Sequence, residues 1–222
     1  MLDALKWDAT GLVSVVAQDR HTGEVRMLAH ANREAVLQTL ETGYAHFFSR
    51  SRQQLWKKGE SSGNTLRTFE VWADCDADAL VYLVEPAGPS CHTGAETCFF
   101  RRVGHGDAPE AGEGSRAAPT LLRLTETLAA RAAGDEEKSY TKSLLEKGAP
   151  KIGAKLREEA GELADALEGE SDERVAAEAA DLLYHAMVGL QLRGLTLRDV
   201  EDVLASRFGV SGHDEKAARG EG

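Results

Sequence analysis

The chain has 222 residues, of which 42% are hydrophobic and 28% charged, and its formal net charge is −11. The length suits one large domain or two small ones, and the composition is typical of a soluble globular protein. The acidic balance argues against binding nucleic acid or an anionic membrane through a broad basic surface. No apolar run is long enough for a membrane span, and the first residues, MLDALKWDATG, do not form a secretory signal. We therefore expect a cytoplasmic location.

The first half of the chain, residues 1–103, is predicted to form a β-rich α+β domain. Short runs rich in β-branched and aromatic residues, separated by turn signals, predict strands. These runs cover residues 11–19, 24–30, 44–51, 65–74, 79–85 and 97–103. A helix is predicted between Asn32, which can cap its start, and Gly43, which can end it. Residues 104–118 are rich in Gly, Ala and acidic residues without apolar periodicity, and this predicts a linker.

The second half, residues 119–222, is predicted to be an all-α bundle. Helices are expected at residues 120–133, 135–147, 151–168, 172–192 and 197–208. Gly148 and Pro150 are well placed to end one helix and begin the next. The sequence thus predicts a β-rich domain joined to a helical one.

All three cysteines lie in the stretch DCDADALVYLVEPAGPSCHTGAETC, which also carries Asp74, Asp76 and Asp78. The region should form a strand, a bend and a second strand. If the chain stays extended across the aspartates, these project to one face and Cys75 projects to the other. Three adjacent carboxylates repel one another unless a hard cation such as Mg²⁺ binds them, so a Mg²⁺ site is predicted here.

Cys75, Cys91 and Cys98 are predicted to be zinc ligands, because cytoplasmic thiols are more commonly free or metal-bound than paired. Three ligands leave the fourth position open to water, which is the pattern of a catalytic zinc. A zinc-bound water can attack an electrophilic carbon. Since Cys75 points away from the aspartates, zinc and Mg²⁺ reach one pocket only if the sheet edge folds round or a second subunit contributes. A homodimer with a shared site is therefore a hypothesis.

Other interpretations of these residues stay open. A free cysteine is often a small core residue. Asp74, Asp76, Asp78 and Glu85 match positions of a calcium-binding loop, but the glycine position holds Ala79 and the flanking residues are typical of strands. A zinc deaminase has similar chemistry, but its H-x-E and P-C-x-x-C motifs are absent.

The stretch SRSRQQLWKKGESSGN precedes the aspartates and is basic and rich in Gly and Ser. Its cationic side chains and backbone N–H groups can bind a phosphate, although a solvated loop is an equal alternative. The candidate substrate-binding residues are Arg50, Arg52, Trp56, Lys57, Lys58, Gly59, Glu60, Ser61, Ser62 and Gly63.

LWKKGESSGN, DCDADAL and GPSCHTGAETCFF together resemble the phosphoribosyl-AMP cyclohydrolase family of histidine biosynthesis, and the resemblance covers residues 1–103. It implies Zn²⁺ at the three cysteines, Mg²⁺ at the three aspartates, and a homodimer whose zinc ligands come from both subunits. The implied reaction is hydrolytic opening of the adenine ring of phosphoribosyl-AMP at N1–C6, with zinc hydroxide attacking C6. His92 is the candidate for proton transfer.

Two of the predicted helices carry acidic residues on one face. Carboxylates within an apolar helix are costly unless they are compensated, and two facing acidic stripes would form an oxygen cage for Mg²⁺. The candidate ligands are Glu158, Glu159, Glu162, Glu178 and Asp181. Lys151 and Lys155, one turn apart, are candidates for binding phosphates. His185 is expected to be a core histidine.

KLREEAGEL, EAADLLYH, SYTKSLLEKG and the HDEKAAR tail resemble phosphoribosyl-ATP pyrophosphohydrolase, over about residues 119–219. The resemblance implies attack of water on a polyphosphate with release of pyrophosphate. Mg²⁺ would neutralise the phosphates and a carboxylate would activate the water, with Glu158 and Glu159 as candidates. The chain is therefore expected to be a bifunctional hydrolase that acts on phosphoribosyl-ATP and then on phosphoribosyl-AMP.

Two rival functions remain. One is a general NTP pyrophosphohydrolase with a zinc-binding regulatory or dimerisation domain, which would hydrolyse ordinary NTPs without opening the ring. The other is a non-enzymatic, metal-stabilised dimerisation module. For that module, Cys91→Ala would unfold the N-terminal domain and not merely inactivate it.

Overall fold

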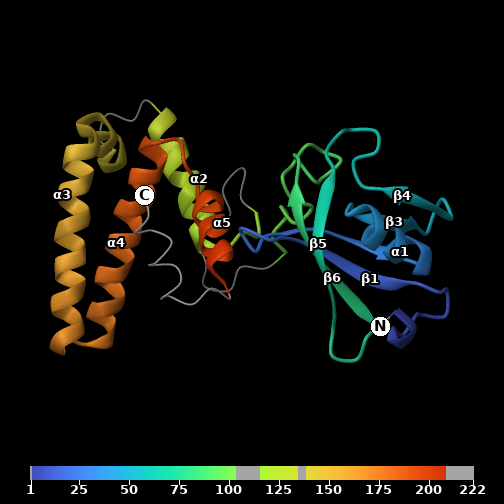
Figure 1. Ribbon diagram of the computed structural model, residues 1–222. Helices are drawn as coiled ribbons and strands as arrows, with labels where there is room; N and C mark the ends of the chain where they lie inside the picture. The colour runs from blue at the N-terminus through green and yellow to red at the C-terminus, as the bar shows by residue number, and fades with distance from the viewer. Residues whose placement is uncertain (1, 104–115, 135–138, 209–222) are drawn as a thin grey trace, which may run out of the picture. The chain divides into compact units, whose positions relative to one another are not determined.

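The computed structural model describes residues 2–103, 116–134 and 139–208. The chain divides between Pro119 and Thr120 into two compact units. The first contains every described strand, and the second consists of helices (Figure 1). The prediction of a β-rich domain followed by a helical one is confirmed. Of the predicted linker, residues 104–115 lie outside the described residues, while residues 116–119 group with the first unit.

A four-stranded sheet in the order β2–β1–β6–β5 forms the framework of the first unit. Its strands are β1 (Val13–Asp19), β2 (Val25–Ala31), β5 (Leu66–Ala73) and β6 (Ala79–Pro86). β1 pairs antiparallel with β2 and parallel with β6, and β5 pairs antiparallel with β6. A short 3-10 helix, η1 (Leu2–Ala4), precedes the sheet.

Helix α1 (Arg33–Thr42) begins and ends where the sequence predicts. The Asn32 side chain accepts a hydrogen bond from the N–H of Ala35, and Gly43 ends the helix with a φ of 70°. Glycine adopts this left-handed conformation without strain, which is why it commonly follows a helix.

A separate hairpin of β3 (His46–Ser49) and β4 (Gln54–Lys57) is anchored to the core by aromatic side chains. Phe47 is fully buried, and its ring centroid lies 5.1 Å from that of Trp56 and 5.8 Å from that of Tyr82 in β6. Burial alternates along β1 and β6, as expected for a sheet with one core face. The hairpin is thereby held against the sheet.

Two segments near the site differ from the predicted strands. Residues 54–57 were interpreted as part of a phosphate-binding stretch, yet they form β4 and pair with β3. Residues 97–103 form no strand. Instead, the Cys98 N–H donates to the backbone oxygen of Arg26 at 2.9 Å, and the Thr97 hydroxyl donates to that of Val25 at 2.6 Å. These bonds fix the segment at the start of β2.

The helical unit is built around two long helices. The described helices are α2 (Thr120–Ala133), α3 (Tyr140–Gly169), α4 (Asp172–Leu192) and α5 (Leu197–Arg207). α3 and α4 lie side by side (Figure 1). The predicted break is confirmed inside α3, where Gly148 has φ 68° and ψ −165° and Pro150 follows. None of the described helices is both long and apolar enough to cross a membrane.

Among the described residues, helix α3 begins later than the sequence predicts, and the tail segment is not described. Ser139 caps α3, its side chain accepting the N–H of Lys142. Residues 135–138, predicted as the start of this helix, lie outside the described residues, and so does the HDEKAAR segment.

The core of the helical unit joins α2, α3 and α4 through Leu128, Ile152 and Val188.

Candidate functional site

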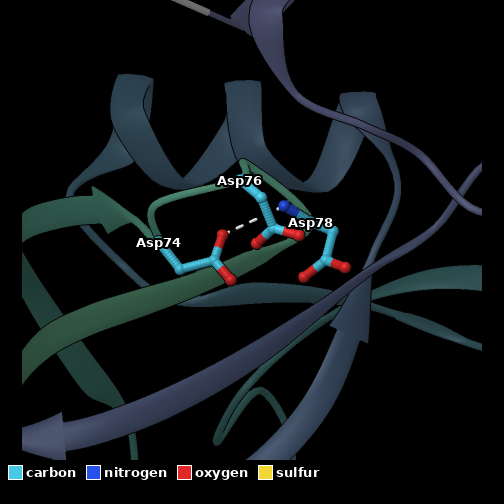
Figure 2. A group of neighbouring side chains, drawn as sticks. All are labelled: Asp74, Asp76 and Asp78. Carbon is cyan, nitrogen blue, oxygen red and sulfur yellow. Dashed lines mark hydrogen bonds between the residues drawn. The ribbon is translucent and has the colours of Figure 1, made fainter.

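The turn between β5 and β6 brings together Asp74, Asp76 and Asp78 (Figure 2). The predicted bend is confirmed, but the chain does not stay extended across the aspartates, since Ala77 has a φ of 65°. The Asp74 carboxylate accepts the backbone N–H groups of Asp78 at 3.0 Å and Ala79 at 3.1 Å. Carboxylate oxygens of the three side chains lie within 4.8 Å of one another. A turn, and not strand alternation, therefore gathers them.

The three exposed carboxylates of this turn repel one another. The negative charges of Asp76 and Asp74 raise the pKa of Asp78 above its usual value. The pKa of Asp74 is lowered, mainly because the Ala79 N–H donates to it. A divalent cation would relieve the repulsion, and hard oxygen ligands suit Mg²⁺. The donor set fits the predicted Mg²⁺.

An open pocket of about 790 Å³ lies in the same unit. Many of the predicted substrate-binding residues line it: Arg52, Trp56, Lys57, Lys58, Gly59, Glu60, Ser61 and Ser62. Arg50 and Gly63 are not among the lining residues, whereas Asn64, which was not predicted, is. Lys58 Nζ donates to the backbone oxygen of Asn64 at 3.0 Å, and burial lowers the pKa of this lysine.

The loop after β4 needs glycine for a steric reason. Gly59 has a φ of 81°, and a Cβ on it would lie 2.3 Å from the backbone carbon of Asn64. The N–H of Gly63 donates to the oxygen of Gly59 at 2.9 Å, which closes the loop. Any side chain at Gly59 would force this part of the pocket wall open.

Two of the three cysteines reach the pocket. Cys91, His92 and Cys98 line it, whereas Cys75 does not. Among the described residues, the three sulfurs do not form a group within metal-binding reach of one another. Cys75 is exposed on the β5–β6 turn. One chain therefore presents two of the predicted zinc ligands at the pocket and the third elsewhere.

The two pocket thiols have different electrostatic environments. The Thr93 hydroxyl donates to Cys91 Sγ at 3.1 Å, and this is the main reason why the pKa of Cys91 is lowered. Burial, followed by the charge of Cys91, raises the pKa of Cys98. Zinc binds thiolates, so a lowered pKa favours binding. The soft sulfur donors fit zinc, provided that a further ligand joins them.

In the helical unit, α3 and α4 bring together oxygens of Glu159, Glu178 and Asp181 within 4.8 Å. Glu159 is 4% exposed and Glu178 is 2% exposed. Glu178 Oε1 forms an ion pair with Arg174, but its buried Oε2 has no hydrogen-bond partner. Burial is the main cause of the raised pKa of Glu178. An unsatisfied buried carboxylate oxygen is costly, and a cation in the cluster would satisfy it. These residues fit Mg²⁺.

Glu158 and Glu159 are neighbours in sequence but differ in environment. Lys155 Nζ lies 2.9 Å from Glu158 and 2.7 Å from Glu159, and these contacts raise the pKa of the lysine. Only Glu159 belongs to the three-residue cluster. Glu162 lies near enough to Glu178 to raise the pKa of Glu178 further. Lys151 is exposed and Lys155 contacts the two carboxylates; that the two lysines bind phosphates stays a prediction.

Several residues beside the cluster were missed or left aside by sequence reasoning. Arg174 pairs with both Glu170 and Glu178, each four residues away, and this spacing was a usable signal. His185 is buried: its Nδ1 donates to the backbone oxygen of Asp181 at 2.9 Å, and the Tyr140 hydroxyl lies 3.2 Å from Nε2. It is the core histidine expected, but no sequence signal links it to Tyr140.

Comparison with known proteins assigns one family to each unit. Residues 27–100 match the model of phosphoribosyl-AMP cyclohydrolase, and residues 121–208 match that of phosphoribosyl-ATP pyrophosphohydrolase. A histidine biosynthesis bifunctional protein HisIE of Wolinella succinogenes is 43% identical, covering 99% of this chain and 97% of its own. That of Aquifex aeolicus is 44% identical, covering 92% and 98%. The chloroplastic protein of Arabidopsis thaliana is 42% identical, covering 99% and 80%.

Proposed function

The chain belongs to the family of bifunctional histidine biosynthesis hydrolases, and from this premise we propose which of its residues serve each reaction. The protein is a bifunctional enzyme. Its helical unit hydrolyses phosphoribosyl-ATP to phosphoribosyl-AMP and pyrophosphate, and its β-rich unit opens the adenine ring of phosphoribosyl-AMP at N1–C6. The two units follow each other along the chain in the reverse of the reaction order.

The ring-opening site uses zinc held by Cys91 and Cys98 of one subunit and Cys75 of a second subunit in a homodimer. The support is that two sulfurs line the pocket while the third, on an exposed turn, is not grouped with them. When bound, zinc supplies an activated water near neutral pH. His92 lies beside Cys91 in the pocket lining and is the residue that we assign to proton transfer.

The basic wall of the same pocket binds the phosphates of the substrate. Arg52, Lys57 and Lys58 supply positive charge, and Ser61 and Ser62 supply hydrogen-bond donors. Cys91 and Cys98 line the same pocket, so a phosphate bound by the basic residues would hold the substrate near the zinc ligands. Mg²⁺ at Asp74, Asp76 and Asp78 adds positive charge on the exposed turn, where the raised pKa of Asp78 reflects uncompensated repulsion.

The pyrophosphate-releasing site uses Mg²⁺ held by Glu159, Glu178 and Asp181, with Glu162 beside them. The buried, unpartnered Oε2 of Glu178 is the observation that supports this site most strongly. When bound, Mg²⁺ neutralises the phosphates of the substrate. Glu158 and Glu159 are the two candidates for activating the water, and Lys155 contacts both, lowering the pKa of Glu158.

A cytoplasmic location is part of the proposal. The three cysteines are free thiols, which suits a reducing compartment. The substrates are small phosphorylated nucleotides of the histidine pathway, and the net charge of −11 disfavours nucleic acid as a partner.

One assay tests both reactions together. Phosphoribosyl-ATP is supplied to the full chain loaded with Zn²⁺ and Mg²⁺, while pyrophosphate and the ring-opened product are followed with time. We expect pyrophosphate first and ring-opened product after a lag. Pyrophosphate without ring opening would contradict the assignment of the first unit. Comparable rates with ATP and other ordinary NTPs would favour the general pyrophosphohydrolase instead.

A further inference from the structure

A buried ion network lies behind the loop that carries two of the cysteines, which we call the cysteine loop (residues 88–98). Arg26, in β2, is 3% exposed and Glu24 is 1% exposed. Arg26 Nη1 donates to Glu24 Oε2 at 2.9 Å, and Arg116 Nε donates to Glu24 Oε1 at 2.6 Å. None of the residues of this network has a part in the reactions proposed above. Burying such charges costs free energy, so their placement needs another explanation.

The Arg26 guanidinium contacts the cysteine loop at three points. Nη2 donates to the Glu96 carboxylate at 2.8 Å and to the backbone oxygen of Gly88 at 3.3 Å, and Nε donates to Ser90 Oγ at 3.1 Å. A fourth contact is made by the backbone, since the Arg26 oxygen accepts the N–H of Cys98 at 2.9 Å. A single residue therefore holds both arms of the loop.

The contacts fall where the two arms of the loop meet. The Ser90 N–H donates to the backbone oxygen of Glu96 at 3.1 Å, and the Cys91 N–H donates to that of Ala95 at 3.0 Å. Ser90 and Glu96 are thus paired by backbone, and their side chains both bind the same guanidinium. Cys91 follows immediately after this pair, so its Sγ position depends on the pair being held.

Only an arginine satisfies all these acceptors. Its five N–H donors are arranged in a rigid planar fork, which matches several acceptors at once. A lysine at position 26 has one nitrogen on a flexible stem and cannot reach Glu24, Ser90 and Glu96 together. The negative charge of Glu24 is shared between Arg26 and Arg116, and this leaves the Arg26 fork free to bind Glu96 as well.

We propose that Arg26 is a positioning residue for zinc, and that the Arg26–Glu96 ion pair holds the cysteine loop with Cys91 and Cys98 directed at the pocket. The inference rests on the zinc site proposed above. Arg26 and Glu96 would thus strengthen zinc binding without contacting the metal or the substrate. Groups that orient metal ligands from outside typically change metal affinity by about 10- to 100-fold.

Zinc affinity, measured by competition with a chromophoric chelator, tests the proposal. We expect zinc to bind about 10-fold more weakly to Glu96→Gln and about 100-fold more weakly to Arg26→Met. Arg26→Lys should not restore the affinity, because it keeps the charge and loses the fork. Glu41→Gln, which removes an exposed acid on α1, is the matched control and should bind zinc like the parent chain. Co²⁺ loaded in place of zinc should show altered absorption bands in the Arg26 and Glu96 variants only.

The same titration separates this inference from the zinc site on which it rests. If the parent chain binds zinc no more tightly than Cys91→Ser, the zinc site itself is wrong. If the parent binds tightly and Glu96→Gln and Arg26→Lys bind within about twofold of it, the positioning role is overturned. Pyrophosphate release by the helical unit reports the concentration of intact chain in each sample. Should Arg26→Met not fold, Glu96→Gln decides, because its half-exposed carboxylate can be neutralised at little structural cost.

Discussion

The two candidate metal clusters differ in how far one chain completes them. In the helical unit, two packed helices bring three carboxylates from α3 and α4 within 4.8 Å of one another. In the β-rich unit, the cysteines lie on a turn and on a separate loop, and only two of them line the pocket. Packed helices align side chains along their whole shared length, whereas loops at different places on a sheet do not. The carboxylate cluster is gathered within one chain, whereas the cysteine site that we propose draws its third ligand from a second subunit.

Metal removal should have the largest effect, because it abolishes both reactions. After excess chelator, Mg²⁺ alone is expected to restore pyrophosphate release, since hard carboxylate ligands bind it. Ring opening should return only when Zn²⁺ is added as well, because thiolates prefer the softer ion. Product assays after each addition check this, and circular dichroism verifies that the metal-free chain stays folded. Recovery of ring opening with Mg²⁺ alone would contradict the assignment of Zn²⁺ to the cysteines and Mg²⁺ to the carboxylates.

Cys91→Ser should reduce ring opening by about 1,000-fold or more, because it removes a proposed ligand of the metal that activates water. Pyrophosphate release by the same chain should change by less than about twofold, since that cluster lies on α3 and α4. Both rates are measured on one preparation with saturating metals. Unfolding of the first unit by this substitution would instead support the metal-stabilised dimerisation module.

Glu178→Gln is the reciprocal variant, and we expect pyrophosphate release to fall by about 100-fold. The amide keeps the size of the side chain but loses the charge that a cation requires. Ring opening of directly supplied phosphoribosyl-AMP should be unchanged. Glu173→Gln, on the exposed first turn of α4, is the control. A normal rate of pyrophosphate release in Glu178→Gln would show that Oε2, which has no hydrogen-bond partner, does not bind metal.

Thr93→Val should have the smallest effect. It tests whether contacts within one chain already favour the thiolate form of Cys91. The Thr93 hydroxyl stabilises the Cys91 thiolate and so lowers its pKa; removing the hydroxyl should raise the pKa. At pH 7 less thiolate would then be present, and alkylation of metal-free protein would slow severalfold at most. The pH profile of alkylation is compared with and without Thr93→Val in a Cys75→Ser, Cys98→Ser background. An unmoved midpoint would contradict the role of Thr93.

Local sequence signals predicted much of the fold. Asn32 and Gly43 bound α1 as expected, and Gly148 breaks α3, because capping and left-handed conformations are properties of single residues. β4 was missed because its four residues belong to a basic stretch rich in Gly and Ser, and only pairing with β3 makes them a strand. The run at residues 97–103 carries aromatic and β-branched residues typical of a strand, but it finds no partner strand among the described residues. Pairing is tertiary and is not visible in a short window.

The candidate site residues were found by chemistry, but their roles depend on geometry. Glu158 and Glu159 are adjacent in sequence, and about 100° of helix rotation decides that only Glu159 enters the cluster. The aspartates gather because Ala77 takes a left-handed conformation, which no motif required. Arg26 lay outside every motif: a charged residue in a strand is ordinarily solvent-facing, and its acceptors on the cysteine loop are more than 60 residues away.

Subunit complementation tests whether each zinc site takes cysteines from both subunits. Cys75→Ser and Cys91→Ser homodimers should each lack ring opening, because every zinc site then misses one sulfur. When the two are mixed and allowed to exchange subunits, half of the dimers are mixed, and in each of these one site regains a full set of ligands. We expect recovery of about a quarter of the parent rate. No recovery, in samples where subunit exchange is verified by mass spectrometry, would mean that the three cysteines do not meet across subunits.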